Sequence, residues 1–227
     1  MVERFARRIP EPTVVRLPLY QRALLELSVG GIGTVSSAEL ADAAGVNAAK
    51  VRKDLSHLGS YGTPGTGYDV NYLLGQVRRE LGLDHEWQVV IAGMGHLGHA
   101  LARSQRFSSE NFRTVALYDV DPAKIGSDVE GLRICHLSEL PAVAELADPG
   151  RLIGVIACPG SAAQDVANRM VEVGIGAILN FAPAILSVTQ PVLIRHVDFA
   201  VELQALAFYV VHPEAGASAE EGSASSL

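Results

Sequence analysis

Long apolar runs are absent from this sequence of 227 residues, and none approaches the roughly 18 residues that a membrane-spanning helix needs. No apolar stretch follows the charged residues at the N-terminus, so we expect no secretory signal and a cytoplasmic protein. Cysteine is scarce as well. Cys135 and Cys158 fit neither a CxxC motif nor zinc-ligand spacing, which favours small core residues over redox thiols. An apolar content of 48% is, by contrast, ample for a folded core.

Positive charge is in the minority, and the formal net charge of −7 taken alone argues against a nucleic-acid partner. The excess of negative charge lies in one part of the chain. Residues 1–85 carry 10 Lys and Arg against 9 Asp and Glu, whereas residues 86–227 carry 8 against 16. Because phosphate binding needs only a local basic face, the first part of the chain is still able to contact DNA.

Two short helices joined by a turn are predicted in the first part. Ser36 and Glu39 have the spacing of a capping box, which begins a helix that Gly45 ends. Asn47 is a suitable N-cap for the second helix, over residues 48–58. Their lengths and the short turn are typical of a helix-turn-helix motif.

The second of these helices has an apolar side and a basic side. Apolar residues recur at i, i+4 and i+7, as a core-facing side requires. The opposite side presents Ala49, Lys50, Lys53, Ser56 and His57, with Arg52 beside them. A narrow basic face with hydroxyl groups suits a helix that enters the major groove. The alternative is an ordinary solvated face; the capping box, the turn and the preceding arginines favour DNA.

Three further elements complete the predicted DNA-binding unit. Apolar periodicity predicts a helix from about Leu17 to Val29, with Pro18 in its first turn. Residues 60–70 alternate turn residues with β-formers, which predicts a hairpin, or wing, after the recognition helix. A helix over residues 69–83 then connects to the second part of the chain.

The second part opens with a glycine-rich turn between a strand and a helix. The apolar strand 87–92 leads into Gly93-Met94-Gly95-His96-Leu97-Gly98, and a helical pattern follows. Such glycines let the backbone approach a pyrophosphate at a helix N-terminus. The next strand ends in Asp119, whose carboxylate would accept ribose hydroxyl groups and repel a 2′-phosphate, with only Lys124 nearby to offset that charge. NAD(H) is therefore favoured over NADP(H), and Asp121 is the competing candidate for this acid.

Alternating strands and helices predict a Rossmann-like, doubly wound parallel sheet. Further strands are expected at residues 152–157 and 177–179, around a helix at 162–173. Asp198 caps a helix over residues 199–211 that is apolar on nearly every side, so it must be buried in the fold or against another subunit. The strand ends offer Cys158, Pro159 and Asn180 but no obvious proton shuttle, so binding without turnover is the simpler function.

These motifs in combination resemble the Rex family of redox-sensing transcriptional repressors over about residues 10–212. The resemblance rests on Lys50-Val51-Arg52-Lys53-Asp54-Leu55-Ser56, Gly65-Thr66-Gly67-Tyr68, the GxGxxG turn, Ile178-Leu179-Asn180-Phe181-Ala182-Pro183 and the last apolar helix. It implies a homodimer that exchanges its C-terminal helices. Such a dimer binds a palindromic operator in the presence of NAD⁺ and is released when NADH rises.

The candidate site residues follow from the motifs and the resemblance together. For operator DNA they are Asn47, Lys50, Arg52, Lys53, Ser56, His57, Tyr61 and Gly65. For NAD(H) they are Gly93, Met94, Gly95, His96, Leu97, Gly98, Asp119, Asp121, Pro159, Asn180, Phe181 and Phe199. Arg16 and Asp198 match a family pair that links the DNA-binding domain to the partner's C-terminal region. No catalytic or metal-binding residue is predicted, and the family's usual wing cation and an aromatic residue are replaced by Pro64 and Ser104.

The expected organisation is a winged-helix domain over residues 1–84 and an NAD(H)-binding domain over 85–196. A dimerisation helix over 197–212 and a disordered tail over 213–227, poor in bulky side chains, complete the chain. Two other functions remain open. One is an NAD-dependent dehydrogenase with a fused helix-turn-helix domain, and the other is a nucleotide- or acyl-CoA-binding regulator built on the same sheet.

Overall fold

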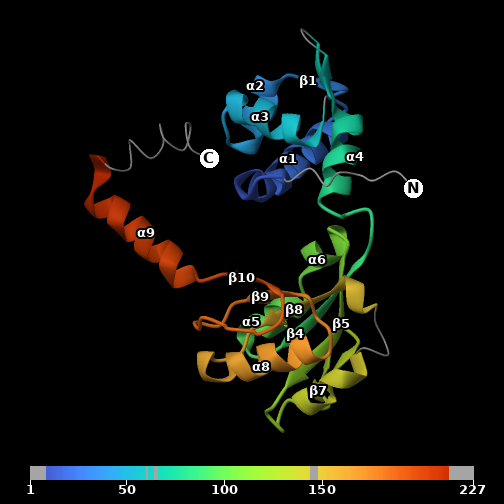
Figure 1. Ribbon diagram of the computed structural model, residues 1–227, viewed down its shortest axis with the longest axis vertical. Coiled ribbons are helices and arrows are strands. Elements are labelled where there is room, and N and C mark those ends of the chain that lie inside the picture. The colour runs from blue at the N-terminus through green and yellow to red at the C-terminus, as the bar shows by residue number, and fades with distance from the viewer. Residues whose placement is uncertain (1–8, 60, 64–65, 144–147, 215–227) are drawn as a thin grey trace. The chain divides into compact units, whose positions relative to one another are not determined.

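The computed structural model describes residues 9–59, 61–63, 66–143 and 148–214, which form two compact units (Figure 1). The chain passes from the first unit to the second between Asp84 and His85, and the second unit runs to Ala205. The predicted tail over 213–227 lies outside the described residues except for Pro213 and Glu214 at its start. In the described ranges, no helix is long and apolar enough to cross a bilayer.

The first unit is a winged helix-turn-helix, as predicted. Its elements are α1 (Glu11–Val29), β1 (Thr34–Val35), α2 (Ser37–Ala44), α3 (Ala48–Leu58), β2 (Gly62–Thr63), β3 (Gly67–Asp69) and α4 (Val70–Glu80). The strands form an antiparallel sheet in the order β1-β3-β2. The capping box is confirmed, since the Ser36 N–H donates to Glu39 Oε2 at 2.8 Å and the Glu39 N–H donates to Ser36 Oγ at 3.2 Å. Asn47 caps α3 by accepting the Lys50 N–H at 2.9 Å.

The first helix differs from its prediction. It begins at Glu11 rather than near Leu17, so Arg16 lies inside α1 and Pro18 lies in its interior rather than its first turn. Two other prolines set the start of the helix: Pro10, which is extended and precedes it, and Pro12, which lies in its first turn. Pro18 removes one backbone donor, yet α1 continues through it because Leu17 and Tyr20, on either side of it, are buried against the rest of the unit. Strand β1 was not predicted, since two residues leave no periodic signal.

A buried carboxylate on α3 connects this helix to α1. Asp54 is 1% exposed and accepts two hydrogen bonds from Arg16, at 2.6 Å and 2.7 Å, which form a bidentate ion pair. It also accepts from the Thr13 hydroxyl at 2.8 Å and the Tyr20 hydroxyl at 2.7 Å. Burial alone would raise the pKa of Asp54, but these hydrogen bonds outweigh it and hold the pKa below the ordinary carboxyl value. The ion pair therefore stabilises the unit above the unfolded carboxyl pKa and is lost as the pH falls through the folded value.

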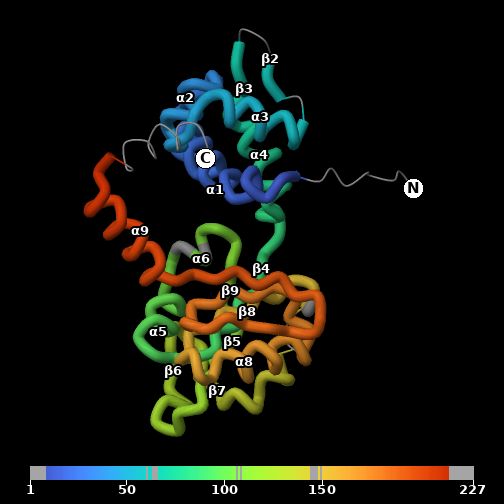
Figure 2. Tube along the Cα trace, turned by 60° about the vertical axis from the view of Figure 1, so that its left-hand side comes forward, coloured from blue at the N-terminus to red at the C-terminus, as the bar shows by residue number. Residues whose placement is uncertain are grey.

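The second unit is a doubly wound sheet, which confirms the predicted fold class. Its strands are β4 (Trp87–Ala92), β5 (Phe112–Asp119), β6 (Asp128–Val129), β7 (Leu132–His136), β8 (Leu152–Ile156), β9 (Ala177–Asn180) and β10 (Leu193–His196). They lie side by side in the order β10-β9-β8-β4-β5-β7-β6 (Figure 2). All neighbours are parallel except the hairpin of β6 and β7. Without β6, this is the strand order of dinucleotide-binding sheets, whose direction of winding reverses at the central strand β4.

Helices cover both faces of this sheet. One apolar cluster joins β4, β8 and β9 to α8 (Gly160–Glu172) and to the 3₁₀ helix η1 (Leu137–Ala142). The opposite face packs against α5 (His96–Ala102), and α6 (Gln105–Ser109) lies between α5 and β5. A second 3₁₀ helix, η2 (Pro149–Arg151), precedes β8. The strands β6, β7 and β10 were not predicted because they are short or partly exposed and lack a clear alternation.

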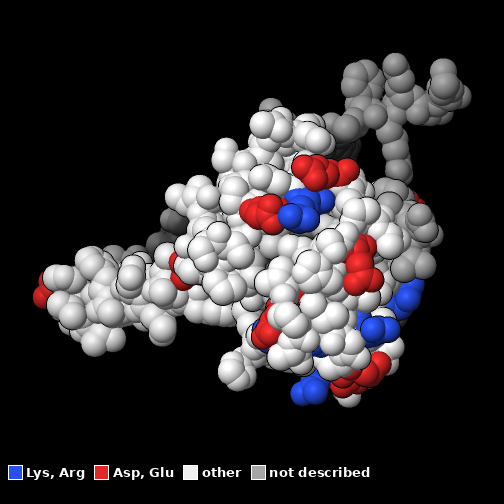
Figure 3. Space-filling model, turned by 90° about the horizontal axis from the view of Figure 1, so that it is seen from below, with Lys and Arg blue, Asp and Glu red and all other residues white. Residues whose placement is uncertain are grey.

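The C-terminal helix α9 (Phe199–Val211) has the predicted bounds, but none of its 13 residues is buried. Burial within the fold of its own chain, one of the two expectations for this helix, is therefore wrong for the described residues. Figure 3 shows the helix, on the left, as an almost uncharged surface. A mostly apolar exposed helix of this length requires another apolar surface to cover it.

Replacing Asp54 by Ala should loosen the first unit. The change leaves a cation and two hydroxyl groups at buried or nearly buried positions without their acceptor, so we expect the free energy of opening of α1 and α3 to fall by about 3–5 kcal/mol. Hydrogen-exchange mass spectrometry of peptides from these helices measures this free energy in the full chain. Asp42→Ala, at an exposed position on α2, is the matched control. Equal protection of α1 and α3 in Asp54→Ala and wild type would contradict the prediction.

Candidate functional site

A cleft of about 260 Å³ lies at the carboxyl end of the parallel sheet. Its walls come from residues that immediately follow three neighbouring strands: Gly93 and Gly95 after β4, Asp119 and Val120 at the end of β5, and Ala157, Cys158 and Pro159 after β8. These strands flank the point where the winding direction reverses. In open α/β sheets, ligands bind in the crevice at this point.

The three glycines of the turn have different tasks. Gly93 has φ +99°, and a Cβ there would lie 2.6 Å from the backbone of Ala157 and Cys158. A Cβ on Gly98 would collide with the carbonyl oxygen of Gly93. Both glycines are therefore required by the fold itself.

Gly95 is different because nothing in the chain requires it to lack a side chain. Its φ of −82° and ψ of −166° are open to any L-residue, and a Cβ there would have no heavy atom within 4 Å. Gly95 lines the cleft. A small residue at this point leaves space for a ligand, which is the fit that a pyrophosphate approaching the backbone needs.

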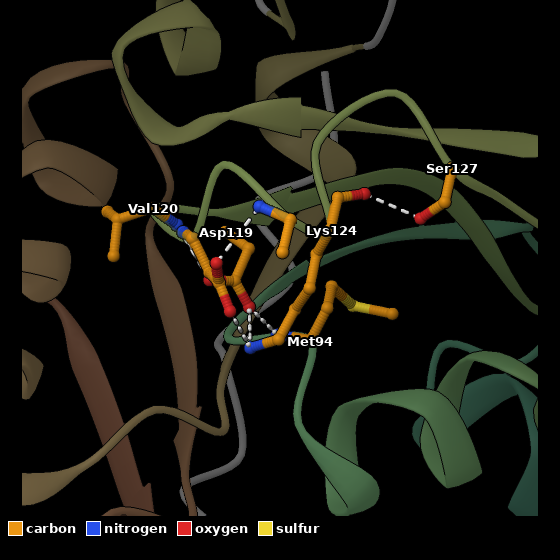
Figure 4. Close-up of polar contacts among 7 residues, drawn as sticks. Met94, Asp119, Val120, Lys124 and Ser127 are labelled. Carbon is orange, nitrogen blue, oxygen red and sulfur yellow. Dashed lines mark hydrogen bonds and ion pairs between the residues drawn. The ribbon is translucent and has the colours of Figure 1, made fainter.

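The carboxylate of Asp119 lies next to the backbone of Met94 in this turn (Figure 4). Its Oδ2 accepts the Met94 N–H at 2.7 Å and Lys124 Nζ at 3.1 Å, and its Oδ1 accepts the N–H groups of Val120 and Asp121 at 2.8 Å and 2.9 Å. Burial raises the pKa of Asp119, but these four donors outweigh it and lower the pKa below the ordinary value. Asp119 is thus a negatively charged group whose partners are already within the protein.

Two other ionisable side chains line the cleft near this carboxylate. Burial raises the pKa of Tyr118 to about 12 and also raises that of the Cys158 thiol. Both are therefore protonated at neutral pH. Cys158 is only half-buried, so the expectation of a small core residue is met in part: it packs against the core and also borders the cleft.

Asn180 was predicted to bind the cofactor. Its side-chain amide makes hydrogen bonds within the loop that follows β9. Its side chain is 1% exposed and donates to the carbonyl groups of Ala182 and Ala184 at 3.1 Å and 2.9 Å. Its Oδ1 accepts the Ala182 N–H at 3.0 Å, and its Nδ2 lies 3.1 Å from His196 Nδ1. The amide therefore shapes the loop that presents Phe181, whose ring stacks on Phe199 at a centroid distance of 6.3 Å.

The structure gathers only part of the predicted cofactor set around the cleft. Gly93, Gly95, Asp119 and Pro159 line it. The side chain of Met94 is fully buried in the core, and only its backbone N–H faces Asp119. The side chain of Lys124 is a lining group that the motif alone did not single out as a ligand. The sequence gives little indication of this role, since a lysine in the turn after the second strand could equally be an ordinary surface residue.

The predicted DNA-binding face lies along α3 and differs in accessibility from residue to residue. Arg52, Lys53 and Ser56 are exposed. Arg52 donates to the Ser37 hydroxyl at 3.0 Å, and the Ser56 hydroxyl donates to the Lys53 carbonyl at 2.6 Å. Burial, followed by repulsion from Arg16, lowers the pKa of Lys50. Lys53 is an exposed cation of this face, and its ammonium makes no hydrogen bond within the described part of the chain.

Other members of the predicted DNA set serve the fold. The Asn47 side chain caps α3, and the Tyr61 hydroxyl donates to the Leu58 carbonyl at 2.9 Å. The Nε2 atom of His57 is buried and has no hydrogen-bond partner in the described part of the chain, so that atom does not face a groove. Gly65 and Pro64 lie outside the described residues.

The predicted coupling residues lie in different units. Arg16 pairs with Asp54 of its own chain, a partner that the sequence did not indicate because it lies 38 residues away. Asp198 precedes α9, and its Oδ1 accepts the Ala200 N–H at 2.9 Å. The predicted contact between Arg16 and a partner's Asp198 stays a prediction.

A second cavity, of about 470 Å³, was not predicted. It lies on the α5 side of the sheet and is lined mainly by apolar side chains, among them Val89, Phe107, Phe112, Val155 and Leu179. An uncovered apolar hollow of this size on a sheet face is typical of an interface.

Comparison with known proteins places these features in a family. Residues 8–56 match the model described as "Putative DNA-binding protein N-terminus", and residues 84–184 match the "CoA binding domain" model. The redox-sensing transcriptional repressor Rex of Streptomyces coelicolor is 52% identical over 219 residues, which covers 96% of this chain and 84% of that protein. The protein of the same name from Pelotomaculum thermopropionicum is 43% identical over 93% of this chain and 99% of its own.

Two solved structures are similar over nearly their whole length. The complex of RSP with β-NAD⁺ and operator DNA has a TM-score of 0.83 at 30% identity, covering 94% of this chain and 97% of that one. The complex of RSP with β-NADH has a TM-score of 0.80 at 29% identity, covering 93% and 98%. RSP is described as a Rex-family repressor.

Gly95→Val should leave the fold intact and abolish dinucleotide binding. The backbone at Gly95 accepts an L-residue and the added side chain meets open space in the protein. We therefore expect the substitution to lower the affinity for the ligand without lowering the stability of the fold. Titration calorimetry with NADH measures the loss, and thermal unfolding measures stability. Gly176→Val is the matched control, because a Cβ there also meets open space. If Gly95→Val retains the wild-type affinity for NADH, the turn is not the binding site.

Proposed function

The chain belongs to the Rex family of redox-sensing transcriptional repressors, and from this premise we propose that α3 binds operator DNA and that NADH in the cleft of the second unit ends this binding. The combination of features that carries the proposal is the presence, in one chain, of an exposed basic recognition helix and a cleft at the switch point of a parallel sheet. Neither feature alone distinguishes a repressor from a metabolic enzyme.

The proposed DNA-binding residues are those on the exposed side of α3, with Lys53, Arg52 and Ser56 at its centre. Asn47 and Tyr61 act by fixing the ends of this helix and the start of the wing. This division separates residues that contact DNA from those that hold the helix in the right orientation.

The proposed NAD(H) site comprises the turn around Gly95 and the strand ends that surround it. The nicotinamide ring carries one positive charge in NAD⁺ and none in NADH. Phe181 and Phe199, which stack on each other, offer an apolar environment that favours a neutral ring over a charged one. Because ligand linkage is reciprocal, a protein that NADH removes from DNA must bind NADH less tightly when DNA is bound.

We propose that the functional protein is a homodimer in which α9 of each chain packs on its partner. The helix is apolar and unburied in its own chain, and the sheet carries an apolar cavity of about 470 Å³. A twofold dimer also suits a palindromic operator, since each recognition helix then reads one half-site.

Asp119, Tyr118 and Cys158, which line the cleft, are poorly suited to acid–base catalysis near neutral pH, which supports a regulator rather than an enzyme. The Asp119 carboxylate is fully hydrogen-bonded, and the pKa values of Tyr118 and Cys158 are raised. A general acid or base works best with a pKa near the working pH. We propose a cytoplasmic location, which operator binding and the sensing of pyridine nucleotides support.

Gel-shift titration at several NADH:NAD⁺ ratios tests this function. The probe is a palindromic duplex that the protein selects from a randomised pool. We expect binding in the presence of NAD⁺ and release as the NADH fraction rises. Release by CoA or acyl-CoA instead would support a CoA-binding regulator, and sustained NADH oxidation with small carbonyl substrates would support a dehydrogenase.

Lys53→Ala should weaken operator binding by about 1–3 kcal/mol if the ammonium reads a base edge, or lower the slope of log affinity against log salt by about 1 if it contacts a phosphate. Affinities measured by fluorescence anisotropy at several salt concentrations distinguish the two. Arg79→Ala, which removes the same charge from the exposed side of α4, is the control. Unchanged affinity and salt slope in Lys53→Ala would exclude this side of α3 from the interface.

A further inference from the structure

The Asp119 carboxylate, expected to bind the adenosine ribose, has no free acceptor position for a ribose hydroxyl group. A carboxylate offers about four acceptor positions. In Asp119, three are taken by backbone N–H groups and the fourth by Lys124 Nζ, and the side chain is only 8% exposed. A ribose hydroxyl can reach Asp119 only by displacing one of these partners.

The partners of Asp119 show what it does instead. Met94 is the second residue of the glycine turn, and its N–H donates to Asp119 at the end of β5. Val120 and Asp121 donate from the chain that leaves that strand. The carboxylate therefore fixes the turn relative to the neighbouring strand end, which makes Asp119 a positioning residue.

Lys124, rather than Asp119, is the charged side chain that is accessible to a ligand in the cleft. Its side chain is 36% exposed and lines the cleft, with Nζ 3.1 Å from Asp119 and 3.6 Å from Asp121. An ammonium has three donors, so these two partners leave one for a ligand. Figure 4 shows Lys124 reaching toward Asp119, while its backbone carbonyl accepts the Ser127 hydroxyl.

Asp121 completes the group at a more exposed position. Its side chain is 44% exposed, its Oδ1 accepts the Ala123 N–H at 3.0 Å, and its Oδ2 faces Lys124. Two carboxylates thus share one ammonium, and the trio carries a net charge of −1. Asp121 can be replaced without affecting the hydrogen bonds that hold the glycine turn, whereas Asp119 cannot.

We propose that Lys124 and Asp121 read the adenosine ribose and that Asp121, rather than Asp119, sets the preference for NADH over NADPH. This inference rests on the proposed function. A 2′-phosphate adds about −1.5 to −2 units of charge. It meets a site that is already negative and an ammonium that two carboxylates already neutralise. Removing the charge of Asp121 makes the trio neutral and frees Lys124 to pair with the phosphate.

Titration calorimetry of the full-length protein with NADH and with NADPH tests the proposal. Wild type should prefer NADH. Asp121→Asn should raise the affinity for NADPH about tenfold while the affinity for NADH changes little, since only the phosphate depends on the local charge. Lys124→Met combined with Asp121→Asn should remove this gain. Glu172→Gln, an exposed change of equal charge on α8, should leave the NADH:NADPH affinity ratio as in wild type.

Asp119→Asn separates positioning from recognition. If Asp119 holds the turn, its replacement weakens the binding of NADH, whereas Asp121→Asn leaves the affinity for NADH nearly unchanged. A wild-type affinity for NADH in Asp119→Asn, or a NADH:NADPH affinity ratio that stays fixed in Asp121→Asn, overturns the proposal, as does a wild type that binds both nucleotides equally. If wild type binds neither nucleotide, the proposed function itself fails, so the two failures are distinct.

Discussion

A buried carboxylate that accepts every hydrogen bond it can is the constraint on which each functional surface of this chain depends. In the first unit, Asp54 joins the recognition helix to α1 through Thr13, Arg16 and Tyr20. In the second, Asp119 joins the glycine turn to the end of β5. A buried negative charge tolerates few arrangements of its donors, so each carboxylate fixes the geometry of the element that it holds.

The same constraint decides which charged groups are left for ligands. Arg16 is a cation in the DNA-binding unit, but two of its N–H groups are committed to Asp54. Lys53, the neighbour of Asp54 in sequence, lies on the exposed side of α3. The two positions differ by about 100° around the helix, so one residue anchors it while the next faces outward. Lys124 and Asp121 have the corresponding outward position beside Asp119.

Local chemistry made much of the fold predictable, and contacts distant in sequence account for what was missed. The capping box, the Asn47 cap and the strand before Gly93 depend on residues a few positions apart, and the structure has them as predicted. The partners Arg16 and Asp54 lie 38 residues apart, and no periodicity reveals them. For the site, the predicted glycine turn lines the cleft, whereas the side chain of Asn180 makes its hydrogen bonds within its own loop, which a sequence motif does not show.

The unburied α9 shows why one copy of this chain is an incomplete fold. Thirteen mostly apolar residues form a regular helix without a buried position, and a helix of this length is marginal in water on its own. An apolar surface outside the helix is therefore needed to order it, and in the proposed dimer the second copy of the chain supplies that surface. Phe199, at the start of α9, stacks on Phe181 in the loop after β9. In the proposed dimer, the helix that packs on the partner thus begins beside the loop after β9, so the Phe181–Phe199 contact is the point at which a change in that loop would first reach the helix.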